Sequence, residues 1–166
     1  LKFPPLYGTP LTLGLVKKRL DEYGLTNKVK FHEIKDPEAT KLKLGKFFDV
    51  EFFRVNHSIP DGVGICLGTP VGNIVHTGDF KLDQTPVDGE NTDLARLAEL
   101  GEEGVLLLLA DSTNVENEGY TLSERSVKKA FEEIIPNCEK RVVVATFSSN
   151  IHRIQQIADV ARESGR

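Results

Sequence analysis

The chain has 166 residues, of which 39% are hydrophobic, and its 21 basic and 25 acidic residues give a net charge of −4. This is enough for one globular domain with a core, and the acidic balance excludes the uniformly basic surface of a protein that coats nucleic acid. No apolar run reaches the roughly 20 residues of a membrane helix and no secretory signal opens the chain, so we expect a cytoplasmic protein without a membrane segment.

The first half of the chain is predicted to be rich in strands. A short strand covers residues 5–7, and a helix begins at Pro10, with Thr9 as its N-cap and leucines 11, 15 and 20 on its apolar face. Alternating or apolar segments then predict strands over residues 28–34, 47–55, 63–68 and 73–78. A helix over 93–100, closed by Gly101, leads into the apolar run 105–110, which is typical of a strand buried on both faces.

The second half alternates helices and strands. Thr121 and Glu124 form a capping-box pattern for a helix that ends at Pro136. Residues 141–147 (RVVVATF) predict another buried strand, and Ser148 or Ser149 then caps a final helix. The change from a strand-rich segment to alternating helices and strands predicts two architectural zones, residues 1–110 and 111–166. The two cysteines, Cys66 and Cys138, lack the spacing of a metal or redox motif and are expected to be unpaired.

Two side chains at predicted strand ends are candidates for metal binding. His57 directly follows one strand, and Asp79 follows another in the segment HTGDFK, next to a glycine that permits close approach. An imidazole and a carboxylate suit Zn²⁺, and a carboxylate can bridge two ions. The alternative is that both are hydrogen-bonded turn residues, and two donors alone do not complete a zinc site. His76 is expected to pack or hydrogen-bond behind the site.

A candidate anion site lies where the predicted strand 141–147 runs into a helix. The N–H groups of a helix N-terminus attract phosphate, and Ser148, Ser149, Asn150, His152 and Arg153 surround this one. Plain N-capping by a serine is the alternative. Asp111, a third strand-end carboxylate, is either a site residue or an Asx turn, and the lysines between 28 and 46 form a solvated face or, secondarily, a surface for RNA.

Taken together, the segments NHSIPDGVG, HTGDFKLDQTPVDG, DLARLAELGEEGVLLLLADSTN and ATFSSNIHRIQQ resemble the RNase J family, bacterial ribonucleases of the metallo-β-lactamase superfamily with a β-CASP insert. The resemblance implies part of an αββα sandwich, a mixed sheet flanked by helices, that runs into the start of a β-CASP α/β domain. The sequence departs mildly from the family at Gly62, where a serine or a similar residue is expected. We expect an internal piece of a longer protein, because the family's His-x-His-x-Asp-His motif should precede Leu1 and the β-CASP remainder should follow Arg166.

The resemblance also implies a function and roles for particular residues. His57 would be a ligand of one zinc ion, Asp79 would bridge two zinc ions, Asp111 would be the acidic residue of the first β-CASP motif, and Ser148 to Asn150 would contact RNA phosphate. It implies a two-zinc 5′-to-3′ exonuclease and endonuclease that acts on 5′-monophosphorylated RNA in mRNA decay and rRNA processing, as a homodimer or homotetramer. The alternatives are a catalytically inactive RNA-binding paralogue and a hydrolase of small esters with the same fold.

Overall fold

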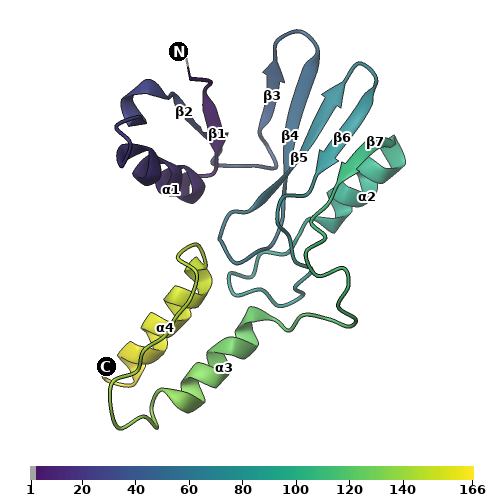
Figure 1. Ribbon diagram of the computed structural model, residues 1–166. Helices are drawn as coiled ribbons and strands as arrows, with labels where there is room; N and C mark the ends of the chain where they lie inside the picture. The colour runs from purple at the N-terminus through teal and green to yellow at the C-terminus, as the bar shows by residue number, and fades with distance from the viewer. Residues whose placement is uncertain (1–2) are drawn as a thin grey trace. The chain divides into compact units, whose positions relative to one another are not determined.

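The computed structural model describes residues 3–166. Its elements in chain order are β1 (Leu6–Gly8), α1 (Pro10–Asp21), a 3₁₀ turn η1 (Thr26–Lys28), β2 (Phe31–Glu33), β3 (Lys41–Leu44), β4 (Phe48–Arg54), β5 (Val63–Thr69), β6 (Gly72–His76), α2 (Leu94–Glu103), β7 (Val105–Leu109), α3 (Glu124–Ile134) and α4 (Ile151–Glu163). The fold is α/β, as the sequence predicted, with a parallel β1–β2 pair and a mixed sheet of order β3-β4-β5-β6-β7 (Figure 1).

The chain forms two compact units. Unit 1 consists of the chain up to Val55 together with Asp61–Asp79 and Asp93–Asp111, and unit 2 consists of Asn56–Pro60, Phe80–Thr92 and Ser112–Arg166. Each unit therefore collects segments that are separated in sequence. The division into domains 1–110 and 111–166 stays a prediction.

The five-stranded sheet forms the core of unit 1. Strands β3 to β6 are antiparallel neighbours, whereas β7 runs parallel to β6, because α2 returns the chain to the same end of the sheet. Alternation places Val50 and Phe52 of β4 in one buried cluster with Ile34, and Phe53, the next residue along the strand, is fully buried. In the lysine-rich stretch 28–46, the predicted strand 28–34 is reduced to β2, and β3 forms where the sequence predicted no strand.

Strand β7 differs from its prediction. The run 105–109 is a strand, but it occupies the edge of the sheet and all five residues are exposed, from 36% at Val105 to 60% at Leu106. An apolar run without polar alternation is typical of a strand covered on both faces. Among the described residues, the sheet ends at β7, so the prediction of burial was wrong here.

The ends of the helices also differ from their predictions. Helix α2 continues through Gly101 to Glu103, and Gly104, with φ +96°, follows it. In α1 the buried residue is Leu13 rather than leucines 11, 15 and 20, and Thr9 makes no side-chain capping bond. Ser123, not Thr121, caps α3 by accepting the Arg125 N–H. Serine is preferred over threonine as an N-cap, which agrees with this choice.

In unit 2, α3 and α4 pack against each other. The segment 141–147 between them is predicted to be a buried strand, but no strand is assigned to it in the structure and Val143 and Phe147 are 85% and 84% exposed. That prediction was wrong, because a strand needs a hydrogen-bonding neighbour and none of the described segments pairs with this one. None of the described helices has the length and apolarity of a membrane-spanning segment.

Candidate functional site

His57 lies in a tight turn that follows β4. The turn is closed by the N–H of Val55, which donates to the carbonyl of Gly62 at 3.0 Å. Asp61 has φ +60°, a conformation that Asp tolerates better than most residues. A Cβ at Gly62 would lie 2.8 Å from the Val55 carbonyl oxygen, so this turn requires glycine where the family resemblance led us to expect serine. The half-buried His57 is thus held on a short and constrained loop.

Asp79 lies in the segment that follows β6. Gly78 before it has φ +64°, which bends the chain, and its N–H donates to Nδ1 of His76 at 2.9 Å. His76 is therefore hydrogen-bonded to the segment that carries Asp79. The N–H of Asp111, after β7, donates to the buried hydroxyl of Thr77 at 3.1 Å, which ties this third strand-end carboxylate to the same segment.

The two predicted ligands belong to different compact units, His57 to unit 2 and Asp79 to unit 1. Their convergence on a metal therefore stays a prediction. Within residues 3–166 no group of three or more His, Cys, Asp or Glu side chains is arranged as a metal site. One imidazole and one carboxylate fit zinc by donor type, but zinc needs about three or four donors, so the described part of the chain would supply only part of the set.

The loop before α4 has a cap different from the predicted one. Asn150 is the N-cap, and its buried side chain accepts the N–H of Arg153 at 3.1 Å. Ser148 and Ser149 precede the cap and are exposed. Capping by a serine was therefore the wrong alternative, and the two hydroxyls stay accessible at the start of the helix, where free N–H groups favour anions.

The two charged residues in the first turn of α4 have carboxylate partners inside unit 2. Nε2 of the buried His152 lies 3.4 Å from Oδ2 of Asp88. One guanidinium nitrogen of Arg153 contacts both carboxylate oxygens of Glu124, at 2.8 and 2.9 Å. A phosphate bound at this helix start would have to compete with these carboxylates for His152 and Arg153.

Asp83 is a buried residue that sequence analysis missed. Its carboxylate accepts the N–H groups of Thr85 at 3.0 Å and Glu124 at 3.3 Å, and Nζ of Lys81 lies at 3.9 Å. Burial by itself raises the pKa of Asp83, but the hydrogen bonds from Thr85, Ser123 and Glu124 and the charge of Lys81 outweigh it and lower the pKa. The signal in the sequence is the Asp-x-Thr pattern of an Asx turn.

A separate cavity in unit 1 lies between the sheet and α2. It has a volume of about 270 Å³ and is lined by both charged and apolar residues, among them Arg96, Glu51 and Leu100, with Cys66 at its wall. Arg96 on α2 contacts Glu51 on β4 at 2.7 Å and also Glu99 and Glu103, which fixes the helix to the sheet. Burial raises the pKa of the Cys66 thiol, and both cysteines are free, as predicted.

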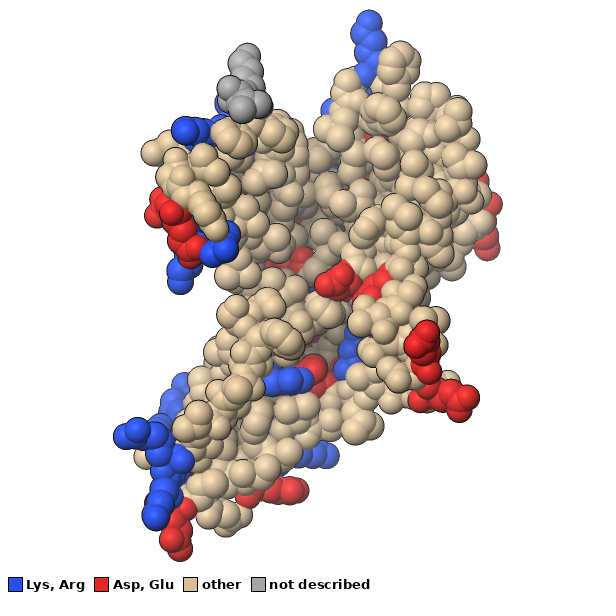
Figure 2. Space-filling model, in the orientation of Figure 1, with Lys and Arg blue, Asp and Glu red and all other residues tan. Residues whose placement is uncertain are grey.

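The lysines between 28 and 46 are exposed, and three of them are paired with acids. Lys35, Lys41 and Lys43 have side chains 77–83% exposed, and each lies within 4 Å of a glutamate or aspartate. On the face drawn in Figure 2, basic side chains occur in small groups among acidic ones. This distribution favours the solvated-face interpretation of the lysine stretch.

Comparison with known proteins shows that the chain is similar to ribonuclease J proteins. Residues 139–166 match the family described as "Ribonuclease J, beta-CASP domain". The chain is 47% identical over 163 residues to Ribonuclease J of Thermus thermophilus, 44% identical over 162 residues to Ribonuclease J2 of Bacillus subtilis, and 46% identical over 152 residues to Ribonuclease J of Helicobacter pylori. These matches cover 98%, 98% and 92% of the chain, but only 28%, 29% and 22% of the relatives.

The fold has a counterpart among solved structures. A crystal structure of a protein of unknown function from Enterococcus faecalis V583 superposes with a TM-score of 0.66 and covers 93% of this chain and 39% of that one. The two sequences are 17% identical, so this likeness concerns the fold alone.

Proposed function

We propose, from the membership of these 166 residues in the ribonuclease J family, that they form part of a zinc-dependent ribonuclease. The observation that carries the proposal is the identity of 44–47% along 98% of the chain to two ribonuclease J proteins. The chain spans about 28% of the length of the Thermus relative. The activity is therefore proposed for the complete polypeptide and not for this part alone.

In the proposed site, His57 and Asp79 supply two of the zinc ligands. The imidazole of His57 and the carboxylate of Asp79 would be the donors, and both are donor types that zinc accepts. The remaining donors would come from outside the 166 residues. Bound zinc lowers the pKa of a coordinated water and stabilises negative charge that develops on the phosphate.

The chain's own residues would hold these two ligands in place. The closed turn between Val55 and Gly62 limits the positions that His57 can take. The bend at Gly78 sets the direction of the chain at Asp79. Such pre-set ligands bind a metal with a smaller loss of conformational entropy than ligands on mobile loops.

We propose RNA with a 5′-monophosphate as the substrate, cut from the 5′ end or internally. The exposed hydroxyls of Ser148 and Ser149, beside the start of α4, suit a phosphate group. Asn150 would contribute by keeping the helix start in order, since its side chain already caps α4. His152 and Arg153 would contribute only after exchanging Asp88 and Glu124 for phosphate.

The test uses the complete polypeptide, with zinc content measured by mass spectrometry and cleavage of 5′-monophosphorylated RNA measured directly. His57→Ala and Asp79→Ala should each abolish cleavage and lower zinc content while the circular dichroism spectrum stays unchanged. His32→Ala and Asp49→Ala serve as controls, since one is an exposed histidine stacked on Tyr7 and the other is an exposed aspartate paired with Lys43. Cleavage at the wild-type rate by the His57 or Asp79 variant would refute the proposed roles.

A further inference from the structure

A buried threonine hydroxyl joins two segments of unit 2. Oγ1 of Thr92 accepts the backbone N–H of Asn56 at 2.9 Å and donates to the backbone carbonyl of Lys81 at 3.0 Å. The N–H of Lys81 in turn donates to the carbonyl of Asn56 at 2.7 Å. Thr92 and Asn56 are each 8% exposed. The three groups therefore close a ring of hydrogen bonds that is shielded from water.

This ring uses the donor and the acceptor capacity of one hydroxyl at the same time. Among side chains of this size, only serine and threonine offer both functions from a single oxygen. Removing the oxygen would leave the Asn56 N–H and the Lys81 carbonyl with one hydrogen bond less in a buried place. The side chain of Asn56 adds a further bond, from Nδ2 to the carbonyl of Glu90 at 3.2 Å.

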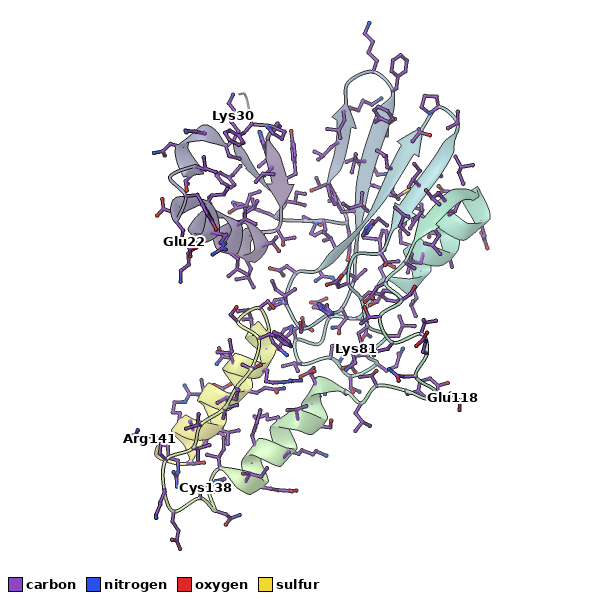
Figure 3. The ribbon with its side chains drawn as sticks, in the orientation of Figure 1. Glu22, Lys30, Lys81, Glu118, Cys138 and Arg141 are labelled. Atoms are coloured by element: carbon purple, nitrogen blue, oxygen red, sulfur yellow. The ribbon has the colours of Figure 1, made fainter. Side chains whose placement is uncertain are left out.

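The ring lies next to the predicted zinc ligands along the chain. Asn56 immediately precedes His57, and Lys81 follows Asp79 by two residues in the loop between β6 and α2, where Figure 3 labels it. Asn56 and Lys81 also form an isolated antiparallel bridge. Thr92 lies next to the N-cap of α2, away from Asn56 and Lys81 in the sequence. Its hydroxyl therefore holds the backbone in place at the point where the His57 turn begins.

We propose that Thr92 is a positioning residue for the zinc site: its hydroxyl fixes the turn that carries His57 and the chain that follows Asp79. This inference rests on the proposed function, because it needs a zinc site to which those two residues contribute. Groups that orient metal ligands change metal affinity by about 10- to 100-fold when they are removed. Thr92 acts in the same way, because it holds the backbone of Asn56, the residue before the ligand His57.

The experiment measures zinc affinity of the complete polypeptide with a competing chelator, together with the visible absorption spectrum of the cobalt-substituted protein. Thr92→Val keeps the shape and removes the hydroxyl, and it should weaken zinc binding at least 10-fold and shift the cobalt bands. Thr92→Ser keeps the hydroxyl, so its zinc affinity should stay within about threefold of the wild-type value. Thr9→Val is the matched control: Thr9 is 2% exposed, and its hydroxyl bonds to Thr12 in unit 1.

The outcomes separate this inference from the proposed function. Wild-type zinc affinity in a folded Thr92→Val protein, or an equal loss in Thr9→Val, would overturn the positioning role, whereas the zinc-dependent activity of the wild type would stand. If Thr92→Val does not fold, Thr92→Ala and Thr92→Ser are compared, and equal zinc affinities of these two would overturn the role in the same way. A wild-type protein that binds no zinc would overturn the proposed function and, with it, this inference.

Discussion

Replacing Asp83 by asparagine tests whether its buried carboxylate stabilises unit 2. The side chain of Asp83 is 3% exposed and accepts two backbone N–H groups, one of them from Glu124 at the start of α3. Asparagine keeps one acceptor oxygen but turns an N–H₂ group toward the second donor. Loss of one hydrogen bond to a charged group costs about 1.5–3 kcal/mol, so we expect a loss near 2 kcal/mol, which is about 30-fold in the unfolding equilibrium constant.

The pH dependence gives a second and independent readout. The pKa of Asp83 is lowered in the folded protein, so its stabilisation is fully present above the unfolded pKa of about 3.9 and is lost as the pH falls through the lower folded pKa. Urea unfolding followed by circular dichroism from pH 7 to pH 3 should show the difference between wild type and Asp83→Asn shrinking below about pH 4. The exposed pair of Asp159 with Arg162 provides the control, Asp159→Asn, with an expected effect below about 0.5 kcal/mol. A difference at pH 7 no larger than that of the control, or one that is constant with pH, would refute the reasoning.

Three other changes probe the turn, the helix attachment and the anion site. Gly62→Ala should destabilise the protein by about 1–3 kcal/mol, because the added Cβ would lie 2.8 Å from a backbone carbonyl oxygen. Gly14→Ala, where the added Cβ lies in a helix and meets nothing within 4 Å, should stabilise the protein by about 0.5–1 kcal/mol. Equal effects of the two changes in thermal melts would contradict this. Arg96→Met should cost about 1–3 kcal/mol in urea unfolding, because Glu51, whose side chain is 19% exposed, is left with the exposed Lys41 at 3.6 Å and loses its closer partner. An unchanged midpoint would rule this out. Ser149→Ala should reduce the preference for 5′-monophosphorylated over 5′-hydroxyl RNA in competition cleavage, and an unaltered ratio would argue against a phosphate contact there.

Local patterns predicted much of unit 1. The segments 47–55, 63–68 and 73–78 were predicted to be strands and form β4, β5 and β6 within one or two residues. Their alternation of side chains depends only on the backbone geometry of a strand, which the sequence displays directly. The same local reasoning identified His57 and Asp79 as strand-end residues, since position after a strand is also a property of the nearby chain.

The hydrogen-bonded supports of these residues were beyond local reasoning. Thr92 bonds to a backbone N–H 36 positions earlier, and Asp83 bonds to one 41 positions later. Neither threonine nor aspartate in a loop indicates such a partner, because the partner is chosen by how distant segments fold back. Only the tertiary structure identifies these two side chains as parts of a network.

The sequence by itself determined the positions of the four α-helices and of the strands β4 to β7 to within a few residues, and it determined which family the chain resembles, because these properties follow from neighbouring residues. The tertiary structure decided which apolar segments are covered. Residues 105–109 and 141–147 have the composition of buried strands, yet the first is an exposed edge and the second is an exposed segment without assigned strand pairing. Burial depends on a partner surface supplied by other parts of a fold, and a run of valines and leucines carries no information about where that partner lies.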